Sequence, residues 1–173
     1  MIKMEYYLSL NSPWTYIGSA RFIDLVKKYN VEVDVKPANF GEVFAHTGGF
    51  PLPKRSVQRQ AYRMYELKRW RDELGIPIIL EPENFPSNEA RGVHAVIATK
   101  LAGGNALALS AEIGRSLWEQ DLNIGDMAVI EEAGRRAGVD VAAVLANAPS
   151  ADELDAIWQA NTKEAVEKGV FGA

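Results

Sequence analysis

The chain contains no cysteine in its 173 residues. Disulfide bonds, a thiol nucleophile and thiolate metal ligands are therefore excluded. Histidine is nearly absent as well, since only His46 and His94 are present, far apart and without helical pairing. A zinc site needs three or four such ligands close together, so we predict no bound metal.

Long apolar runs and an excess of basic residues are also lacking. No apolar run approaches the roughly 18 residues of a membrane helix, and the start, MIKMEYYLSL, lacks the long apolar core of a signal peptide. The formal net charge is -4, whereas nucleic-acid binding normally requires a basic face. We therefore expect no membrane and no nucleic-acid partner, and a cytoplasmic location by default.

What is present is ordinary globular composition. Hydrophobic residues make up 47% of the chain and charged residues 24%. These values exclude a disordered chain, and the length suits one domain or one domain with an insertion.

The first forty residues carry the pattern of a βαβ unit. Residues 3–9 alternate between polar and apolar side chains, which predicts a strand. Ser12 is a suitable helix N-cap with Pro13 at the first helical position, and apolar residues recur at helical spacing up to Tyr29. Alternating valines over 31–37 predict a second strand. A helix between two strands implies parallel pairing with a right-handed crossover.

The rest of the chain is predicted to be mostly helical. Residues 39–56 are rich in Gly and Pro and predict a long loop, and long loops in compact domains are often functional. Helices are predicted at 57–74, 88–102, 105–120, 126–137, 140–146 and 151–168. Asn88 and the Ser150–Glu153 capping box are the N-terminal signals of two of these helices. The helical periodicity predicts a core position for Trp70, Trp118 and Trp158.

Ser12 stands at the sharpest candidate site. A helix that begins directly after a strand offers free N–H groups and a partial positive charge, and both stabilise an anion such as a thiolate. A hydroxyl at this position can donate a hydrogen bond to a bound sulfur. The simpler interpretation is that Ser-Pro only starts a helix, without any ligand.

Four segments together resemble one family. NSPWTYIG (11–18), LKRWRDELGIP (67–77), EPENFPSN (81–88) and EAVEKGVFGA (164–173) occur in the order, and nearly at the spacing, of 2-hydroxychromene-2-carboxylate isomerases and kappa-class glutathione transferases. These belong to the thioredoxin-like superfamily of disulfide oxidoreductase A, and the resemblance covers essentially the whole chain.

The resemblance implies an α/β fold, with a thioredoxin-like βαβ start and a large all-helical insertion. The thioredoxin-like domain would comprise 1–40 and 165–173, and the insertion 41–164. Family members continue with a ββα half that carries part of the glutathione site. That half is expected to be missing here, because the chain stops at Ala173.

The resemblance also implies a function and a set of site residues. The expected activity is that of a glutathione-dependent isomerase acting on 2-hydroxychromene-2-carboxylate or a similar small aromatic carboxylate, with glutathione as cofactor and a homodimeric state. Ser12 would be catalytic and bind glutathione together with Lys54, while the substrate would be contacted by Trp14, Pro53, Lys54 and Phe85. Two alternatives stay open: a kappa-type glutathione transferase or peroxidase, and a non-catalytic thioredoxin-like binding module.

Several of these positions depart from the family pattern or have a structural alternative. Pro53-Lys54 replaces an Asn-Arg pair of the isomerases, and Phe85 stands at or beside a Tyr. Phe85 and Trp14 could instead be packing residues. Basic side chains at Lys54, Arg55, Arg59 and Arg63 could hold carboxylates, or could form a solvated helix face.

Overall fold

The computed structural model describes residues 2–173, and its N-terminal part is the predicted βαβ unit. Strand β1 (Ile2–Leu8), helix α1 (Pro13–Tyr29) and strand β2 (Val31–Pro37) follow one another. The strands pair in parallel, with Ile2 opposite Val31 and Leu8 opposite Pro37. Helix α1 begins at its Ser12 cap and ends at Asn30, whose φ of 49° is left-handed.

Helices make up most of the remaining chain. They are α2 (Phe40–Thr47), the 3-10 turn η1 (Leu52–Lys54), α3 (Val57–Leu74), α4 (Ala90–Leu101), α5 (Ala106–Trp118), α6 (Met127–Ala137), α7 (Val141–Ala146) and α8 (Ala151–Glu167). The predicted Ser150–Glu153 capping box is present. Helix α4 begins after Glu89 rather than at Asn88, although the Asn88 Oδ1 still accepts the Ala90 N–H at 3.1 Å.

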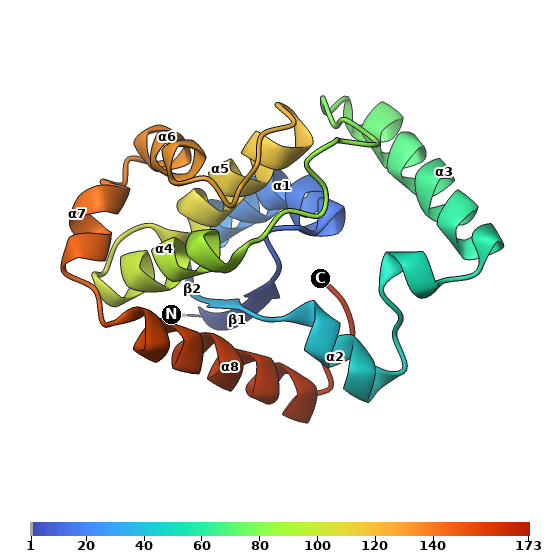
Figure 1. The fold of residues 1–173 in the computed structure, drawn as a ribbon. Coiled ribbons are helices and arrows are strands. Elements are labelled where there is room, and N and C mark those ends of the chain that lie inside the picture. The colour runs from blue at the N-terminus through green and yellow to red at the C-terminus, as the bar shows by residue number, and fades with distance from the viewer. Residues whose placement is uncertain (1) are drawn as a thin grey trace.

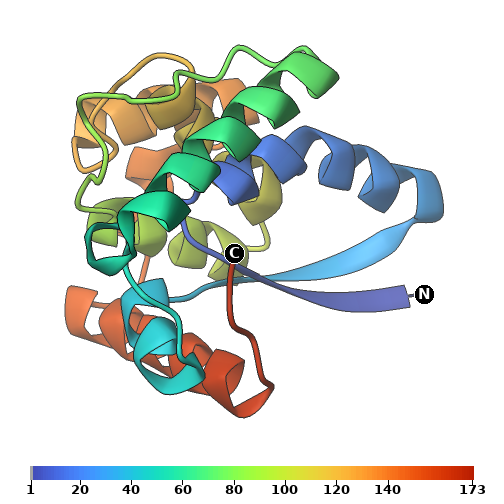
Figure 2. The ribbon, with the colours of Figure 1, turned by 90° about the vertical axis from the view of Figure 1, so that its right-hand side faces the viewer.

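The sheet lies between two helical layers. Helices α1, α4 and α5 lie on one side and α2 and α8 on the other (Figures 1 and 2). Leu8 and Val35 of the strands share one hydrophobic core with Val93, Ile113 and Trp118 of the helices. The helical block is therefore built onto the βαβ unit, and the division into 1–40 with 165–173 and 41–164 stays a prediction.

Two sequence-based expectations were wrong. The loop expected over 39–56 contains α2, because the Asn39 side chain accepts the Gly41 N–H and Gly48 ends the helix with a positive φ of 75°. Phe40 of this helix is buried, which explains why the segment folds. Trp70 does not belong to the core, since 39% of its surface is exposed, whereas Trp118 is fully buried as predicted.

The last residues lead back to the start of α1. After α8, residues 168–173 form no strand, and the described part of the chain has a sheet of two strands. Figure 2 shows this segment rising from the end of α8 toward the centre of the molecule. None of the helices formed by residues 2–173 is both long and apolar enough to cross a membrane.

Candidate active site

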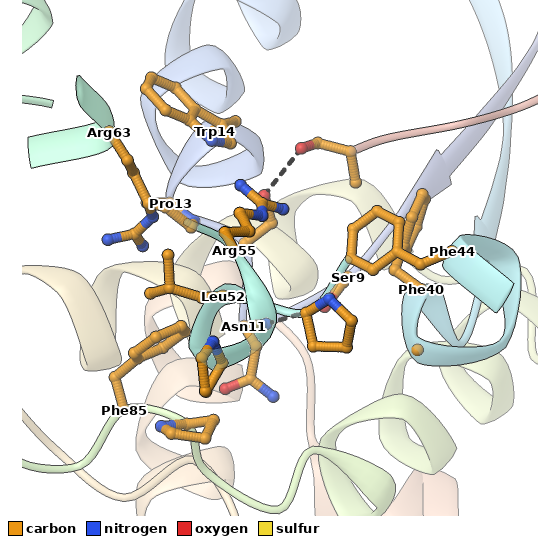
Figure 3. A pocket seen from close by; sticks show the side chains of 16 residues that line it. Ser9, Asn11, Pro13, Trp14, Phe40, Phe44, Leu52, Arg55, Arg63 and Phe85 are labelled. Atoms are coloured by element: carbon orange, nitrogen blue, oxygen red, sulfur yellow. Dashed lines mark hydrogen bonds between the residues drawn. The ribbon is translucent and has the colours of Figure 1, made fainter. Parts of the chain in front are cut away.

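A cavity of about 490 Å³ opens beside the N-terminus of α1. Its walls come from segments far apart in the sequence: the start of α1, helix α2, residues 51–53 with Arg55, helix α3, the Phe85–Pro86 segment and Ala173 (Figure 3). Most of the wall is apolar, including Trp14, Phe40 and Phe44. The cavity can therefore enclose an apolar ligand next to the helix end.

Ser12 lies in the wall of this cavity. Its half-buried Oγ accepts the Thr15 N–H at 3.2 Å, which caps the helix, and donates a hydrogen bond to the Ala173 carbonyl oxygen at 2.9 Å. In the first turn of α1, Pro13 has no N–H, and the N–H of Tyr16 bonds to the Ser12 carbonyl oxygen. Among residues 2–173, the N–H of Trp14 therefore has no acceptor. The helix end thus holds two groups able to donate to an anion, the Ser12 hydroxyl and the Trp14 N–H.

The turn that carries Ser12 is fixed to the segment before α4. The Asn11 side chain pairs with the backbone of Ser87, through bonds of 2.9 and 3.0 Å. The Glu89 carboxylate accepts the Ser9 hydroxyl at 2.9 Å and the Asn11 N–H at 3.1 Å. Burial raises the pKa of Glu89, against the opposite effect of these hydrogen bonds. Glu89 therefore positions the turn, although its carboxylate does not line the cavity.

Phe85 is held between the core and the cavity. The Asp121 carboxylate accepts the backbone N–H groups of Glu83 and Asn84, both at 2.9 Å, and these bonds lower the pKa of Asp121. The Phe85 ring packs against Trp118 at a centroid distance of 5.0 Å. Because Phe85 also lines the cavity, it acts both as a packing residue and as an exposed aromatic wall.

Two arginines give the cavity its charge. The Arg55 Nε donates to the Phe50 carbonyl oxygen at 2.7 Å, and its guanidinium lies 5.8 Å from the Phe44 ring centre. The Arg63 guanidinium lies 5.5 Å from the centre of the Phe85 ring. No Asp or Glu belongs to the described residues that line the cavity. Its electrostatic potential therefore favours an anionic ligand.

The structure brings most of the proposed site residues together. Ser12, Trp14, Pro53 and Phe85 all line the one cavity, whereas Lys54 is exposed at the end of η1 and lies outside the lining. In the part of the chain described, no group of three or more Asp, Glu or His residues is arranged to hold a metal.

Sequence reasoning missed the aromatic side chains of α2 and the role of Glu89. The Asn39 cap and the Gly48-Gly49 pair could have revealed α2, because these residue types mark helix ends. Nothing local distinguishes Glu89 from other surface carboxylates, since its partners Ser9 and Asn11 lie 80 and 78 residues away.

A parallel βαβ unit with its helix N-terminus facing a ligand-sized cavity is a feature that thioredoxin-like proteins share with other α/β proteins. The chain belongs to the family described as the DSBA-like thioredoxin domain, which it matches over residues 3–173. The family resemblance inferred from the four segments is thereby confirmed.

Individual relatives are distant but extend over nearly the whole chain. Glutathione S-transferase kappa 2 of Caenorhabditis elegans is 23% identical, over 98% of this chain and 78% of the relative. The solved 2-hydroxychromene-2-carboxylate isomerase is 19% identical with a TM-score of 0.77, over 98% and 82% of the two chains. The cytosolic disulfide reductase DsbM of Pseudomonas aeruginosa, solved with GSH, is 18% identical with a TM-score of 0.70, over 99% and 83%. All three relatives are enzymes.

Proposed function

We propose that this protein is a glutathione-dependent isomerase acting on 2-hydroxychromene-2-carboxylate or a similar aromatic carboxylate. The observation that carries the proposal is the Ser12 hydroxyl, at the N-terminus of α1, in the wall of an apolar cavity whose only charged side chains within 2–173 are those of Arg55 and Arg63. The similarity to an isomerase, a kappa transferase and a reductase solved with GSH supports it.

The residues of the site fit glutathione. A thiolate beside the start of α1 would receive hydrogen bonds from the Ser12 hydroxyl and the Trp14 N–H, in the favourable field of the helix end. For this, the Ser12 hydroxyl turns from the Ala173 carbonyl oxygen toward the sulfur. When bound, glutathione would supply a thiolate that adds reversibly to a conjugated double bond, permits rotation about the resulting single bond and is eliminated unchanged.

The chain itself would orient the substrate and exclude water. Trp14 and Phe85 would provide aromatic surfaces for a flat ring, and Pro53 also lines the cavity. Lys54, at the exposed end of η1, would contact a carboxylate of glutathione at the outer rim. Stabilisation of the thiolate by the Ser12 and Trp14 donors and by the helix end would keep the glutathione sulfur ionised at neutral pH, as the addition requires.

The test is turnover of 2-hydroxychromene-2-carboxylate with glutathione by a Ser12→Ala variant. We expect a loss of about 100-fold in kcat, as for other preorganised donors to a developing anion. Ser12→Thr keeps a hydroxyl and should retain most activity. Ser150→Ala removes an equivalent N-cap on α8, remote from the cavity, and controls for the loss of a cap alone. Unchanged turnover in Ser12→Ala would refute the assigned role.

Kappa-type transferase activity is the second candidate, supported by the Caenorhabditis elegans relative. Product analysis separates the two: a glutathione conjugate indicates a transferase, while an isomer formed without loss of glutathione indicates an isomerase. A non-catalytic binding module would show no affinity for glutathione by calorimetry.

We further propose a homodimer, and the feature that supports it is the outer face of α3. Tyr62 and Tyr65 are 61% and 69% exposed there, and such aromatic side chains are enriched at interfaces. Light scattering on the purified protein tests this proposal, and a monomer mass would exclude it. The cytoplasmic location stays a prediction.

A further inference from the structure

Arg63 is a buried cation with almost no polar partner. It lies on the inner face of α3 with only 9% of its surface exposed. Its one hydrogen-bond contact among residues 2–173 is a long one, from Nη1 to the sulfur of Met64 at 3.7 Å. A guanidinium has five N–H donors and a thioether is a weak acceptor, so nearly all of its donor capacity is unused.

No ion pair among residues 2–173 compensates this charge, and Glu81, which lines a neighbouring cavity that Arg63 also borders, is not paired with it. Arg63 forms none of the ion pairs found among residues 2–173, and the other charged group in the cavity wall is the like-charged Arg55. Burial lowers the pKa of Arg63, and the charge of Arg55 lowers it further. A buried unpaired charge destabilises the unliganded protein, and such groups are typical of functional sites.

The surroundings of Arg63 define the kind of anion that fits. Arg63, Leu52 and Phe85 line both the cavity at Ser12 and a neighbouring cavity of about 420 Å³. These three side chains therefore form the wall between the two cavities. The Arg63 guanidinium lies 5.5 Å from the centre of the Phe85 ring. Figure 3 shows the Arg63 head group extending from α3 toward Phe85 and Leu52. An anion here meets a flat apolar surface on one side.

We propose that Arg63 is the specificity-determining anchor for the second substrate, an organic anion whose acid group binds the guanidinium and whose flat apolar body lies on Phe85. Two parallel N–H donors of the guanidinium match the two oxygens of a carboxylate. The inference rests on the proposed function, because it concerns the same cavity, and it assigns to Arg63 the substrate contact that the family resemblance implied for Lys54. It does not depend on the chemistry of Ser12.

The test compares two probes of nearly the same shape, the anionic 1-naphthoate and the neutral 1-naphthamide, by calorimetry without glutathione. We expect the wild-type protein to bind the naphthoate at least ~30-fold more tightly, the low end of what loss of one partner of a buried charge pair costs. Arg63→Met should abolish this preference, and Arg63→Lys should restore part of it. Arg69→Met, on the exposed side of the same helix, should leave the preference unchanged.

Thermal unfolding shows whether Arg63→Met is folded. Since no partner of the guanidinium is lost, we expect a Tm at or above that of the wild type, whereas a structural arginine would give a lower Tm. The proposal is overturned if the wild-type protein binds neither probe, or binds the naphthoate no more tightly than the naphthamide. It is also overturned if Arg63→Met still binds the naphthoate more tightly while Arg55→Met does not. The two roles have separate readouts: failure of the thiolate role appears as unchanged turnover in Ser12→Ala, and failure of the anchor appears as an unchanged naphthoate preference in Arg63→Met, measured without glutathione.

Discussion

Replacement of Glu89 should displace the turn that presents Ser12. The Glu89 carboxylate accepts the Ser9 hydroxyl at 2.9 Å and the Asn11 N–H at 3.1 Å. Glu89→Ala would leave both donors without this acceptor in a region with little access to water. Each unsatisfied buried donor costs about 1–3 kcal/mol, and the Ser9 hydroxyl can turn elsewhere, so we expect the free energy of unfolding to fall by about 2–4 kcal/mol.

Glu89→Gln gives a sharper second measurement. The amide keeps one acceptor oxygen and the shape of the side chain, so the loss at neutral pH should be about 1 kcal/mol or less. Because burial raises the pKa of Glu89, the folded state binds its proton more tightly than the unfolded chain. The stability of the wild type should therefore decrease as the pH rises from the ordinary value of 4.5 through the raised pKa, and Gln should remove this contribution.

The assay is urea unfolding between pH 4 and pH 8. This is about the range over which a raised carboxyl pKa makes stability depend on pH. Glu131→Ala, at an exposed position of α6, is the control and should change stability by less than about 0.5 kcal/mol. Turnover should also fall in Glu89→Ala, because Ser12 lies one residue beyond the clamped Asn11. Equal stability of Glu89→Ala and Glu131→Ala would refute the reasoning.

Two further perturbations test other parts of the structure. Leu67 is the fully buried apolar residue of α3, so Leu67→Ala should reduce the free energy of unfolding by about 2–5 kcal/mol in urea, while Glu73→Ala at an exposed position of the same helix should cost less than about 0.5 kcal/mol. Hydrogen bonds from Lys168 and Lys36 lower the pKa of Glu164 to about 2 in the folded protein. The ionised Glu164 therefore stabilises the folded state at pH values above the unfolded pKa near 4.5, and this stabilisation is lost as the pH falls toward 2. Glu164→Gln should therefore make unfolding less dependent on pH in this acidic window, and an unchanged acid profile would contradict the assignment.

Local signals predicted most of the secondary structure. Ser12-Pro13 began α1, and the Ser150–Glu153 capping box began α8, because a cap depends on side chains within three residues of one another. Helix α2 escaped prediction although it has the same kind of cap. The Gly and Pro residues that follow it at 48, 49, 51 and 53 obscured the periodicity. Burial of Phe40 against α8 and the end of the strand stabilises the helix.

The burial of individual side chains was less predictable. Trp70 and Trp118 both follow a helical pattern, yet one is exposed and the other fully buried. Arg63 shows the reverse error, since a basic residue on a helix is usually solvated and here it is enclosed. Which face of a helix is covered depends on the neighbouring elements, which periodicity does not identify.

The sequence by itself determined the helix end at Ser12, because an N-cap serine, a following proline and the preceding strand are all local features. The tertiary structure alone decided what that helix end faces. It brought Ala173 to Ser12 across 161 residues, placed the unpaired Arg63 against Phe85 and put the Glu89 carboxylate under the turn. Such contacts arise only when the whole core is packed, since their free energy depends on burial and on partners far along the chain.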